Sequence, residues 1–191
     1  MAREGQAKTL NDTDHQYFME YLAKTRHFLR DRAIYLLTMR AGMRIGTVAQ
    51  ITLKDIIDTS GQLKKVVILR KSITKGNKTV SAYLSHPELR QALEEWIEYR
   101  KNNVRETLFY SQKGSPFSPN SLSKLMLAHY EKAGLEGRSS HSGRRSFASN
   151  CLKNGMDIVA LSKVMSHSSI NTTMNYIHHD ENELLSLIES V

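Results

Sequence analysis

Five side chains in four short segments of this sequence have the types and the order needed to act on a phosphodiester. They are two arginines, two histidines and a tyrosine: Arg44, His141, Arg144, His167 and Tyr176. A phosphodiester resists nucleophiles because its nonbridging oxygens already carry charge and gain more toward the transition state. A guanidinium offers paired donors and stays protonated, so it is suited to neutralising that charge. Arg44 and Arg144 are therefore the predicted phosphate clamps.

The remaining residues of this set can supply the other steps of the reaction. His141 and His167 can donate hydrogen bonds to the same oxygens, and His141 can help to accept a phenolic proton. Tyr176 follows His167 by nine residues. A phenol with a reference pKa of about 10 becomes a useful nucleophile only where positive charge stabilises its phenolate. The leaving 5′ oxygen needs a proton, which Lys75 in the turn TKGNK can supply, with Lys78 as the alternative donor.

Each of these residues taken alone is weak evidence for catalysis. Single arginines often cap helices or lie on the surface, histidine–arginine pairs three residues apart are common on solvated helix faces, and most tyrosines are half-buried packing residues. The five in this order, within AGMRIGTVAQI, SSHSGRRSFA and LSKVMSHSSINTTMNYIH, are not expected by chance. The combination, rather than any single member, predicts the chemistry.

Composition sets outer bounds on the kind of protein. The 191 residues include 27 Lys and Arg against 19 Asp and Glu, a formal net charge of +8, which favours a polyanionic partner. The single cysteine, Cys151, excludes an intrachain disulfide, and no zinc-binding pattern is present. We therefore expect a reducing compartment. No apolar run approaches the roughly 18 residues of a membrane span. We expect a soluble, cytoplasmic protein without a membrane partner.

The elements that must position the candidate residues are predicted to be mostly helical. A helix capped by Asn11 or Thr13 precedes an apolar helix around 33–37, and Gly42 interrupts the latter before a short helix over 45–51, so that Arg44 lies at a bend. Two strands over 63–69 and 79–84 flank the lysine-bearing turn. Further helices are expected over 87–101, 118–133, from Ser140, over 157–166 and from Ser169, the last of them carrying Tyr176 near its end.

The segments that carry these residues resemble the sequence boxes of the tyrosine recombinase (phage integrase) family. AGMRIGTVAQITLKDI resembles the first arginine box, TKGNK the hairpin with the catalytic lysine, HSGRRSFAS the second box and SHSSINTTMNY the histidine-to-tyrosine box. The resemblance covers essentially the whole chain. It implies an α+β, mostly α catalytic fold with a small antiparallel sheet, and site-specific DNA recombination through a 3′-phosphotyrosyl intermediate without metal or cofactor. The catalytic residues that it implies are Arg44, Lys75, His141, Arg144, His167 and Tyr176.

The resemblance also implies partners and a domain organisation. The expected partners are double-stranded DNA, further copies of the chain in a tetramer on paired sites, and an accessory DNA-bending protein, in a bacterial or phage setting. We expect one catalytic domain over 1–191, with a flexible leader over 1–10 and a tail helix over 180–191 that can be exchanged between protomers. Most members carry an additional N-terminal DNA-binding domain. The chain is therefore either a catalytic fragment or resembles the short fimbrial phase-variation invertases, and its start at Met1 favours the second.

Two positions depart from the family pattern. Thr47 stands where members commonly carry an acidic residue, and a neutral hydroxyl is expected to support its neighbours less strongly. Arg145 stands where many members have histidine, a tolerated variant. Two alternatives stay open: a type IB topoisomerase, which would relax DNA without recombining sites, and a catalytically silent DNA-binding regulator, against which the intact set of six residues argues.

Overall fold

The computed structural model describes residues 7–74, 76, 78–103, 105–167, 169–174 and 176. The chain forms two compact units, Met1–Phe147 and Ala148–Val191, whose boundary falls within helix α7 (Ser142–Lys153). The expected tail helix over 180–191 lies outside the described residues. Within the described ranges, no helix is long and apolar enough to cross a membrane.

The first unit begins with the two helices that the sequence predicted, and the predicted cap at Asn11 is confirmed. Helix α1 (Asp12–Ala23) starts where the Asn11 side chain accepts from the Asp14 N–H at 2.7 Å and the Asp14 carboxylate accepts from the Asn11 N–H at 3.2 Å. Helix α2 (Phe28–Met39) is buried along most of its length. Its Tyr35 and the Phe18 ring of α1 are fully buried and meet edge to face at 4.9 Å.

The chain bends sharply after α2. Gly42 has a φ of +60°, which suits glycine, and Arg44 precedes helix α3 (Ile45–Gln50) as predicted. A four-residue helix α4 (Leu53–Ile56) follows, and Thr52 and Asp55 form the capping box at its start. The sequence did not predict α4, because one helical turn is too short to show an apolar period.

The predicted strand pair is confirmed, in a shorter form. Strands β1 (Val66–Leu69) and β2 (Val80–Tyr83) are antiparallel, with Val66 opposite Tyr83. The 3₁₀ helix η1 (Lys71–Ile73) lies between them and was not expected. The turn that carries Lys75 therefore follows η1 and does not join the two strands directly.

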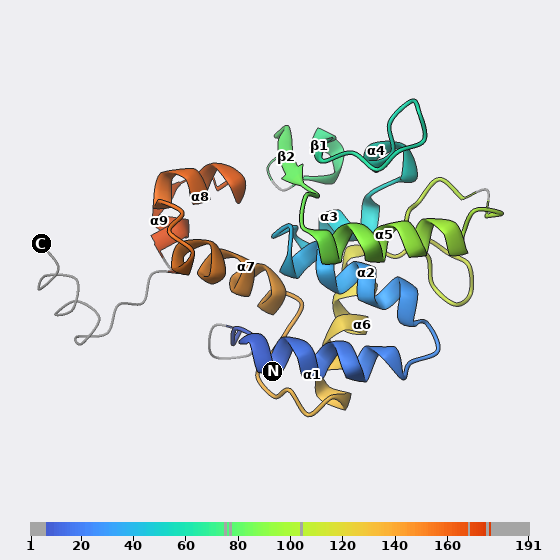
Figure 1. The fold of residues 1–191 in the computed structure, drawn as a ribbon, viewed down its shortest axis with the longest axis horizontal. Coiled ribbons are helices and arrows are strands. Elements are labelled where there is room, and N and C mark those ends of the chain that lie inside the picture. The colour runs from blue at the N-terminus through green and yellow to red at the C-terminus, as the bar shows by residue number, and fades with distance from the viewer. Residues whose placement is uncertain are drawn as a thin grey trace, which may run out of the picture. The chain divides into compact units, whose positions relative to one another are not determined.

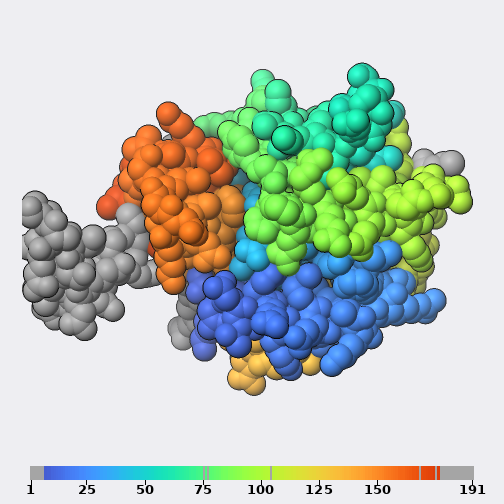
Figure 2. All heavy atoms as spheres, in the orientation of Figure 1, coloured from blue at the N-terminus to red at the C-terminus, as the bar shows by residue number. Residues whose placement is uncertain are grey.

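Two longer helices complete the framework of the first unit. Helix α5 (Pro87–Tyr99) has Pro87 at its first turn and packs along α2, and helix α6 (Pro119–Lys132), capped by Ser118, packs on α3 (Figure 1). Figure 2 shows the side chains of α5 (green) filling the surface between the strands and the first two helices (blue). The result is the expected mostly helical α+β fold with a small antiparallel sheet.

Residues before α1 also take part in the first unit. The Lys8 N–H donates to the Gly137 carbonyl at 3.1 Å, and the Leu10 N–H donates to Ser146 Oγ at 2.7 Å. Leu10 is only 2% exposed. The sequence predicted that both residues belong to a flexible leader over 1–10. Their hydrogen bonds instead attach this segment to residues just before and within α7.

The second unit contains the remainder of α7 and two short helices. Helix α8 (Ile158–Val164) begins as predicted at Asp157, whose carboxylate accepts from the Val159 and Ala160 N–H groups at 2.8 and 2.9 Å. Helix α9 (Ile170–Met174) packs against α8. Tyr176 lies two residues beyond the end of α9, in a turn, and not within the helix as the sequence predicted.

Candidate active site

Two of the predicted site residues line one cavity of the first unit. The cavity has a volume of about 320 Å³ and is formed by the start of α3, the chain before the lysine turn and the turn before α7. Its lining residues are Arg44, Ile45, Gly46, Thr47, Gln50, Ser72, Ile73, Thr74 and His141. Three separate segments thus bring a guanidinium and an imidazole to one surface.

Arg44 is positioned by the bend between α2 and α3. Its carbonyl accepts from the Thr47 and Val48 N–H groups at 2.9 and 3.0 Å, so Arg44 is the N-cap residue of α3. The Met43 N–H donates to the Leu37 carbonyl at 3.0 Å and closes the end of α2. The backbone on both sides of Arg44 is therefore fixed by hydrogen bonds.

Arg144 is bound to the same bend. It is 8% exposed, and its Nη1 donates a hydrogen bond to the Gly42 carbonyl, two residues before Arg44. The neighbouring Gly143 makes this close approach possible, because a Cβ at that position would lie 2.2 Å from Thr38 Oγ1 in α2. The first turn of α7 thus lies against the last turn of α2 and places both arginines at one bend.

His141 lies in the turn just before α7. The sequence predicted a helix from Ser140, which would place His141 and Arg144 one turn apart on one face. The helix starts instead at Ser142, so His141 precedes it and Arg144 lies in its first turn. The Ser139 N–H donates to Ser142 Oγ at 2.9 Å, and the His141 N–H donates to Ser139 Oγ at 3.3 Å. These bonds hold the turn compact and His141 at the cavity.

The lysine turn borders the cavity through Thr74. Lys75 itself lies outside the described residues. The Thr74 hydroxyl contacts the carbonyls of Lys71 and Lys78, and Gly76 has a φ of +79°. The turn is therefore closed by Thr74 at its base, and the prediction that Lys75 rather than Lys78 acts there stays a prediction.

Thr47 connects the first arginine box to the lysine turn. Its hydroxyl donates to the Ile73 carbonyl at 3.0 Å, and the residue is 6% exposed. An ionised carboxylate has no proton to donate to a carbonyl oxygen, so an acidic residue could not make this bond. The sequence treated Thr47 as a weaker substitute for an acid and missed its role as a donor.

The second unit brings His167 and Tyr176 together. Their rings stack with centroids 5.8 Å apart and planes 16° from parallel. His167 Nδ1 shares a hydrogen bond of 2.7 Å with Thr173 Oγ1, and the Tyr176 N–H donates to the Thr173 carbonyl at 3.0 Å. Thr173 is fully buried and positions both residues. Sequence reasoning missed this role of Thr173, because a threonine in a helix shows no signal of its own.

The connection from α8 to His167 uses an uncommon backbone conformation. Ser166 has a φ of +50°, and the His167 N–H donates to the Ser162 carbonyl at 3.0 Å. Non-glycine residues rarely adopt a left-handed conformation. This turn sets the direction in which the chain leaves α8 and thereby the position of His167.

The described site residues therefore fall into two groups. Arg44 and His141 line one cavity of the first unit, and Arg144 is bound to the backbone of the bend just before Arg44. Cationic and hydrogen-bonding groups of this kind can bind an oxyanion. His167 and Tyr176 form a stacked pair in the second unit.

Comparison with known sequences finds relatives over most of the chain. The phage integrase family matches residues 7–183. The chain is 31% identical over 168 residues to the tyrosine recombinase XerC of Histophilus somni strain 2336, covering 84% of this chain and 53% of that protein. It is 30% identical over 187 residues to XerC of Pseudomonas fluorescens, covering 96% and 60%. The chain thus spans little more than half the length of these curated relatives.

Solved structures show the same fold. The crystal structure of XerA recombinase superposes with a TM-score of 0.79 at 21% identity, covering 98% of this chain and 66% of that one. The XerH site-specific recombinase bound to palindromic difH substrate, in a post-cleavage complex, gives a TM-score of 0.75 at 26% identity, covering 94% and 51%. With the family match extending from residue 7 to residue 183, this chain belongs to the phage integrase family.

Proposed function

We propose that the chain is the catalytic part of a site-specific DNA recombinase that cleaves and rejoins DNA through a phosphotyrosyl intermediate. The observation that carries the proposal is the arrangement of Arg44 and His141 around one cavity, with Arg144 bound to the backbone of the same bend. This concentration of donors matches what a phosphodiester requires as its charge grows. The similarity to proteins named tyrosine recombinases supports the same function.

Each residue has a proposed role in the reaction. Arg44 and Arg144 bind the nonbridging oxygens, and His141 and His167 donate hydrogen bonds to them. The Tyr176 oxygen, after losing its proton, attacks phosphorus and forms the tyrosyl ester, while the bond from phosphorus to the 5′ oxygen breaks. Lys75 protonates that leaving oxygen. A second 5′ hydroxyl reverses the attack and restores the diester, so the bond energy is retained and no external energy source is consumed.

The proposed partners are duplex DNA and further copies of this chain. We infer a tetramer on paired sites, helped by an accessory DNA-bending protein, in the cytoplasm of a bacterium. The apolar residues Leu184, Leu185 and Ile188 recur at helical spacing, and so short a segment needs a surface on which to dock. We propose that this tail docks on a neighbouring protomer. Deleting 181–191 should then reduce joining of paired sites while leaving binding to a single site unchanged.

The nucleophile can be tested with a pool of nicked duplexes of randomised sequence. Cleavage next to a nick releases a short fragment, so the strand cannot be rejoined and the covalent complex accumulates. The wild-type chain should form a complex that survives denaturing electrophoresis, and Tyr176→Phe should form none while still retarding duplex DNA. Tyr17→Phe, which alters a tyrosine of α1 that is 52% exposed, is the matched control and should react like the wild type. A covalent complex with Tyr176→Phe would assign the attack to another residue.

A second assay separates recombination from relaxation. Sites recovered from the covalent pool can be cloned in pairs on a supercoiled plasmid, and exchange between them is read by sequencing across the junctions. Relaxation of the plasmid without exchange would identify a type IB topoisomerase. Retardation of the randomised nicked duplexes without any covalent complex would identify a DNA-binding regulator.

A further inference from the structure

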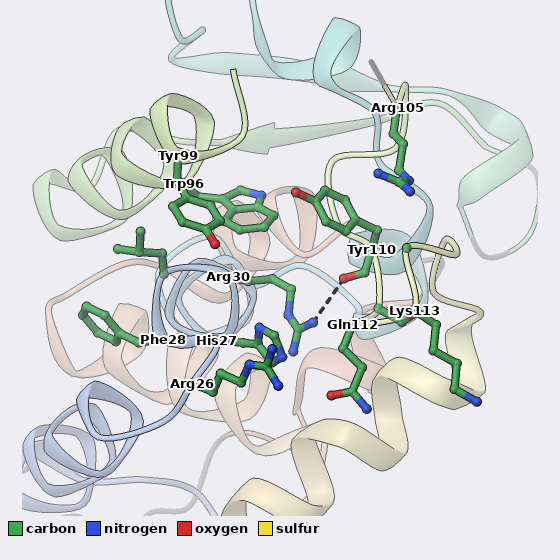
Figure 3. A pocket seen from close by; sticks show the side chains of 13 residues that line it. Arg26, His27, Phe28, Arg30, Trp96, Tyr99, Arg105, Tyr110, Gln112 and Lys113 are labelled. Atoms are coloured by element: carbon green, nitrogen blue, oxygen red, sulfur yellow. Dashed lines mark hydrogen bonds between the residues drawn. The ribbon is translucent and has the colours of Figure 1, made fainter. Parts of the chain in front are cut away.

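A second and larger cavity lies in the first unit, at the far end of α2 from Arg44. It has a volume of about 480 Å³, within the range typical of small-molecule sites, and shares no lining residue with the Arg44 cavity. Helix α2 has 12 residues, a length of about 18 Å, and its first turn borders this cavity while its last turn precedes the bend. Loop residues before α2, the end of α5 and the loop that ends at Gly114 complete the wall (Figure 3).

The wall of this cavity carries an excess of positive charge. Arg26, Arg30, Arg105 and Lys113 line it together with His27, and no aspartate or glutamate is among its described lining residues. Arg30 is 5% exposed; its Nε donates to the Asp31 carboxylate at 2.7 Å and its Nη1 to the Tyr110 carbonyl at 3.1 Å. Asp31 does not line the cavity, but its ion pair with Arg30 neutralises that guanidinium. The net positive charge of the wall therefore comes from the other cationic residues.

His27 adds an unsatisfied polar atom to the same wall. Its Nε2 is buried and has no hydrogen-bond partner among the described residues. Figure 3 shows its ring beside the Arg30 guanidinium and the Arg26 side chain, below the aromatic part of the cavity. A buried imidazole nitrogen without a partner is costly, and a small movement of the ring toward the cavity would let a polar ligand relieve that cost.

Aromatic rings form the opposite wall. Tyr99 is 70% exposed and stacks on Trp96 with ring centroids 5.7 Å apart and planes 21° from parallel. The Trp96 and Tyr110 centroids are 5.5 Å apart, and the Arg105 guanidinium carbon lies 5.1 Å from the Tyr110 centroid. Trp96 is held from behind, since its Nε1 donates to the Leu108 carbonyl at 3.0 Å. The exposed Tyr99 ring is thus a rigidly supported surface on which a flat group can stack.

Gly114 leaves space for a cationic side chain beside the aromatic wall. It has a φ of +80°, and a Cβ there would lie 2.4 Å from Arg105 Nη2. The Gly114 N–H donates to the Ser111 carbonyl at 2.8 Å and closes the tight turn that presents Gln112 and Lys113. The loop therefore leaves room for the Arg105 side chain next to Tyr110.

We propose that this cavity binds a nucleoside phosphate, with the base stacked on Tyr99 and the phosphate held by cationic residues of the wall, Arg26 among them. Inorganic phosphate would use the cations and leave the rings unused, while an uncharged aromatic ligand would do the reverse. A nucleotide uses both walls. It can arrive as a free nucleotide or as the unpaired nucleotide at a DNA end, and the site is independent of the Tyr176 chemistry.

The chain contains its own probe for this site. Trp96 is the only tryptophan of the sequence, so its fluorescence reports occupancy directly. Titration of the full chain with ATP, adenosine and tripolyphosphate should show that ATP binds about tenfold more tightly than either part alone, because stacking and charge act together. Equal binding of ATP and tripolyphosphate would show a nonspecific response to charge and overturn the proposal.

Variants at exposed positions separate the two walls, with calorimetry as a second readout. Tyr99→Ala should weaken ATP binding about tenfold and leave tripolyphosphate binding unchanged, since only stacking is lost. Arg26→Ala should weaken both ligands. Tyr17→Ala and Lys54→Ala, which truncate exposed side chains outside the cavity, should change neither. Unaltered ATP binding by Tyr99→Ala would contradict the proposal.

Duplex DNA distinguishes the two sources of the nucleotide, free nucleotide and the unpaired nucleotide at a DNA end. A blunt duplex is compared with the same duplex carrying a short single-stranded overhang. If the duplex with the overhang quenches Trp96 fluorescence, the blunt duplex does not, and Tyr99→Ala abolishes the quenching, the site binds DNA ends. If ATP quenches the fluorescence and the overhang has no effect, the site binds free nucleotide. Quenching by neither overturns the proposal. Tyr176→Phe should retain the binding, so failure of this site and failure of the proposed strand cleavage are separable.

Discussion

The Thr47 hydroxyl donates a hydrogen bond to the Ile73 carbonyl over 3.0 Å and so ties the helix that follows Arg44 to the segment that leads to Lys75. Thr47→Val keeps the shape of the side chain and removes the donor. We expect the variant to fold and to cleave about fivefold more slowly, the effect of losing roughly 1 kcal/mol of positioning energy. The measurement is the rate of covalent complex formation on a captured nicked duplex.

Thr47→Ser is the matched control, because it retains the hydroxyl and should cleave like the wild type. Thr47→Glu introduces the acidic residue common in the family, places a carboxylate against the Ile73 carbonyl, and should be slower than Thr47→Val. Wild-type rates for Thr47→Val would show that the bond has no bearing on catalysis.

The arginines and the lysine should differ in their response to the leaving group. Arg44→Ala or Arg144→Ala should reduce cleavage more than duplex affinity, because these donors act on charge that grows toward the transition state. Lys75→Ala should slow leaving-group departure instead. A substrate with a 5′-bridging sulfur, which leaves without protonation, should restore cleavage by Lys75→Ala and not by the arginine variants. Rescue of Lys78→Ala alone would transfer the acid role to Lys78.

Gly143 is predicted to be essential for the packing of α7 on α2. A Cβ at this position would lie 2.2 Å from Thr38 Oγ1 and 3.3 Å from the Met39 nitrogen, and the backbone atom cannot move aside. Gly143→Ala should lower the free energy of unfolding by about 1–3 kcal/mol, measured by urea denaturation. Gly46→Ala is the control, since its Cβ would be 3.5 Å from the nearest atom. Equal stability of both variants would mean that the contact relaxes without cost.

Glu88 gives stability a defined dependence on pH. Burial opposes its ionisation, but hydrogen bonds from His15 and Arg40, at 3.0 and 2.8 Å, outweigh burial and lower the pKa of the carboxyl from 4.5 to about 2. A pKa that is lower in the folded state stabilises the fold above the unfolded value, and this contribution is lost as pH falls from about 4.5 to about 2.

Urea unfolding at pH 6, 4 and 3 tests this dependence. The wild-type chain should lose stability across the series, and Glu88→Gln should lose less, because it has no proton to gain. The variant should also be less stable at pH 6, where the charged pair with Arg40 is missing. Parallel curves for the two proteins would show that other carboxylates determine the acid sensitivity.

The helix framework was predictable because its signals are local. Asn11, Pro87, Ser118 and Asp157 mark helix starts through their own side-chain chemistry, and all four were found at the predicted positions. What the sequence could not show are contacts between distant segments. Arg144 on the Gly42 carbonyl is an example, because only the packed structure brings residues 102 positions apart together.

Short elements and hydroxyl donors escaped prediction for related reasons. The 3₁₀ helix η1 spans three residues, too few for a periodic pattern, and its presence changes how the turn with Lys75 is attached. Thr173 binds His167 from inside a helix, where threonine has no distinctive signal. The residue types of the candidate site were thus readable in the sequence, while the groups that hold them in place were not.

Ser166, with its φ of +50°, is the position that a stability-guided redesign would change first. Glycine would relieve about 1 kcal/mol of backbone strain there. The same change would let the chain leave α8 in more directions and so release the orientation of the His167 backbone. An engineered Ser166→Gly variant should therefore melt at a higher temperature and cleave more slowly. Selecting recombinase variants by thermal tolerance alone would favour this change and lose activity.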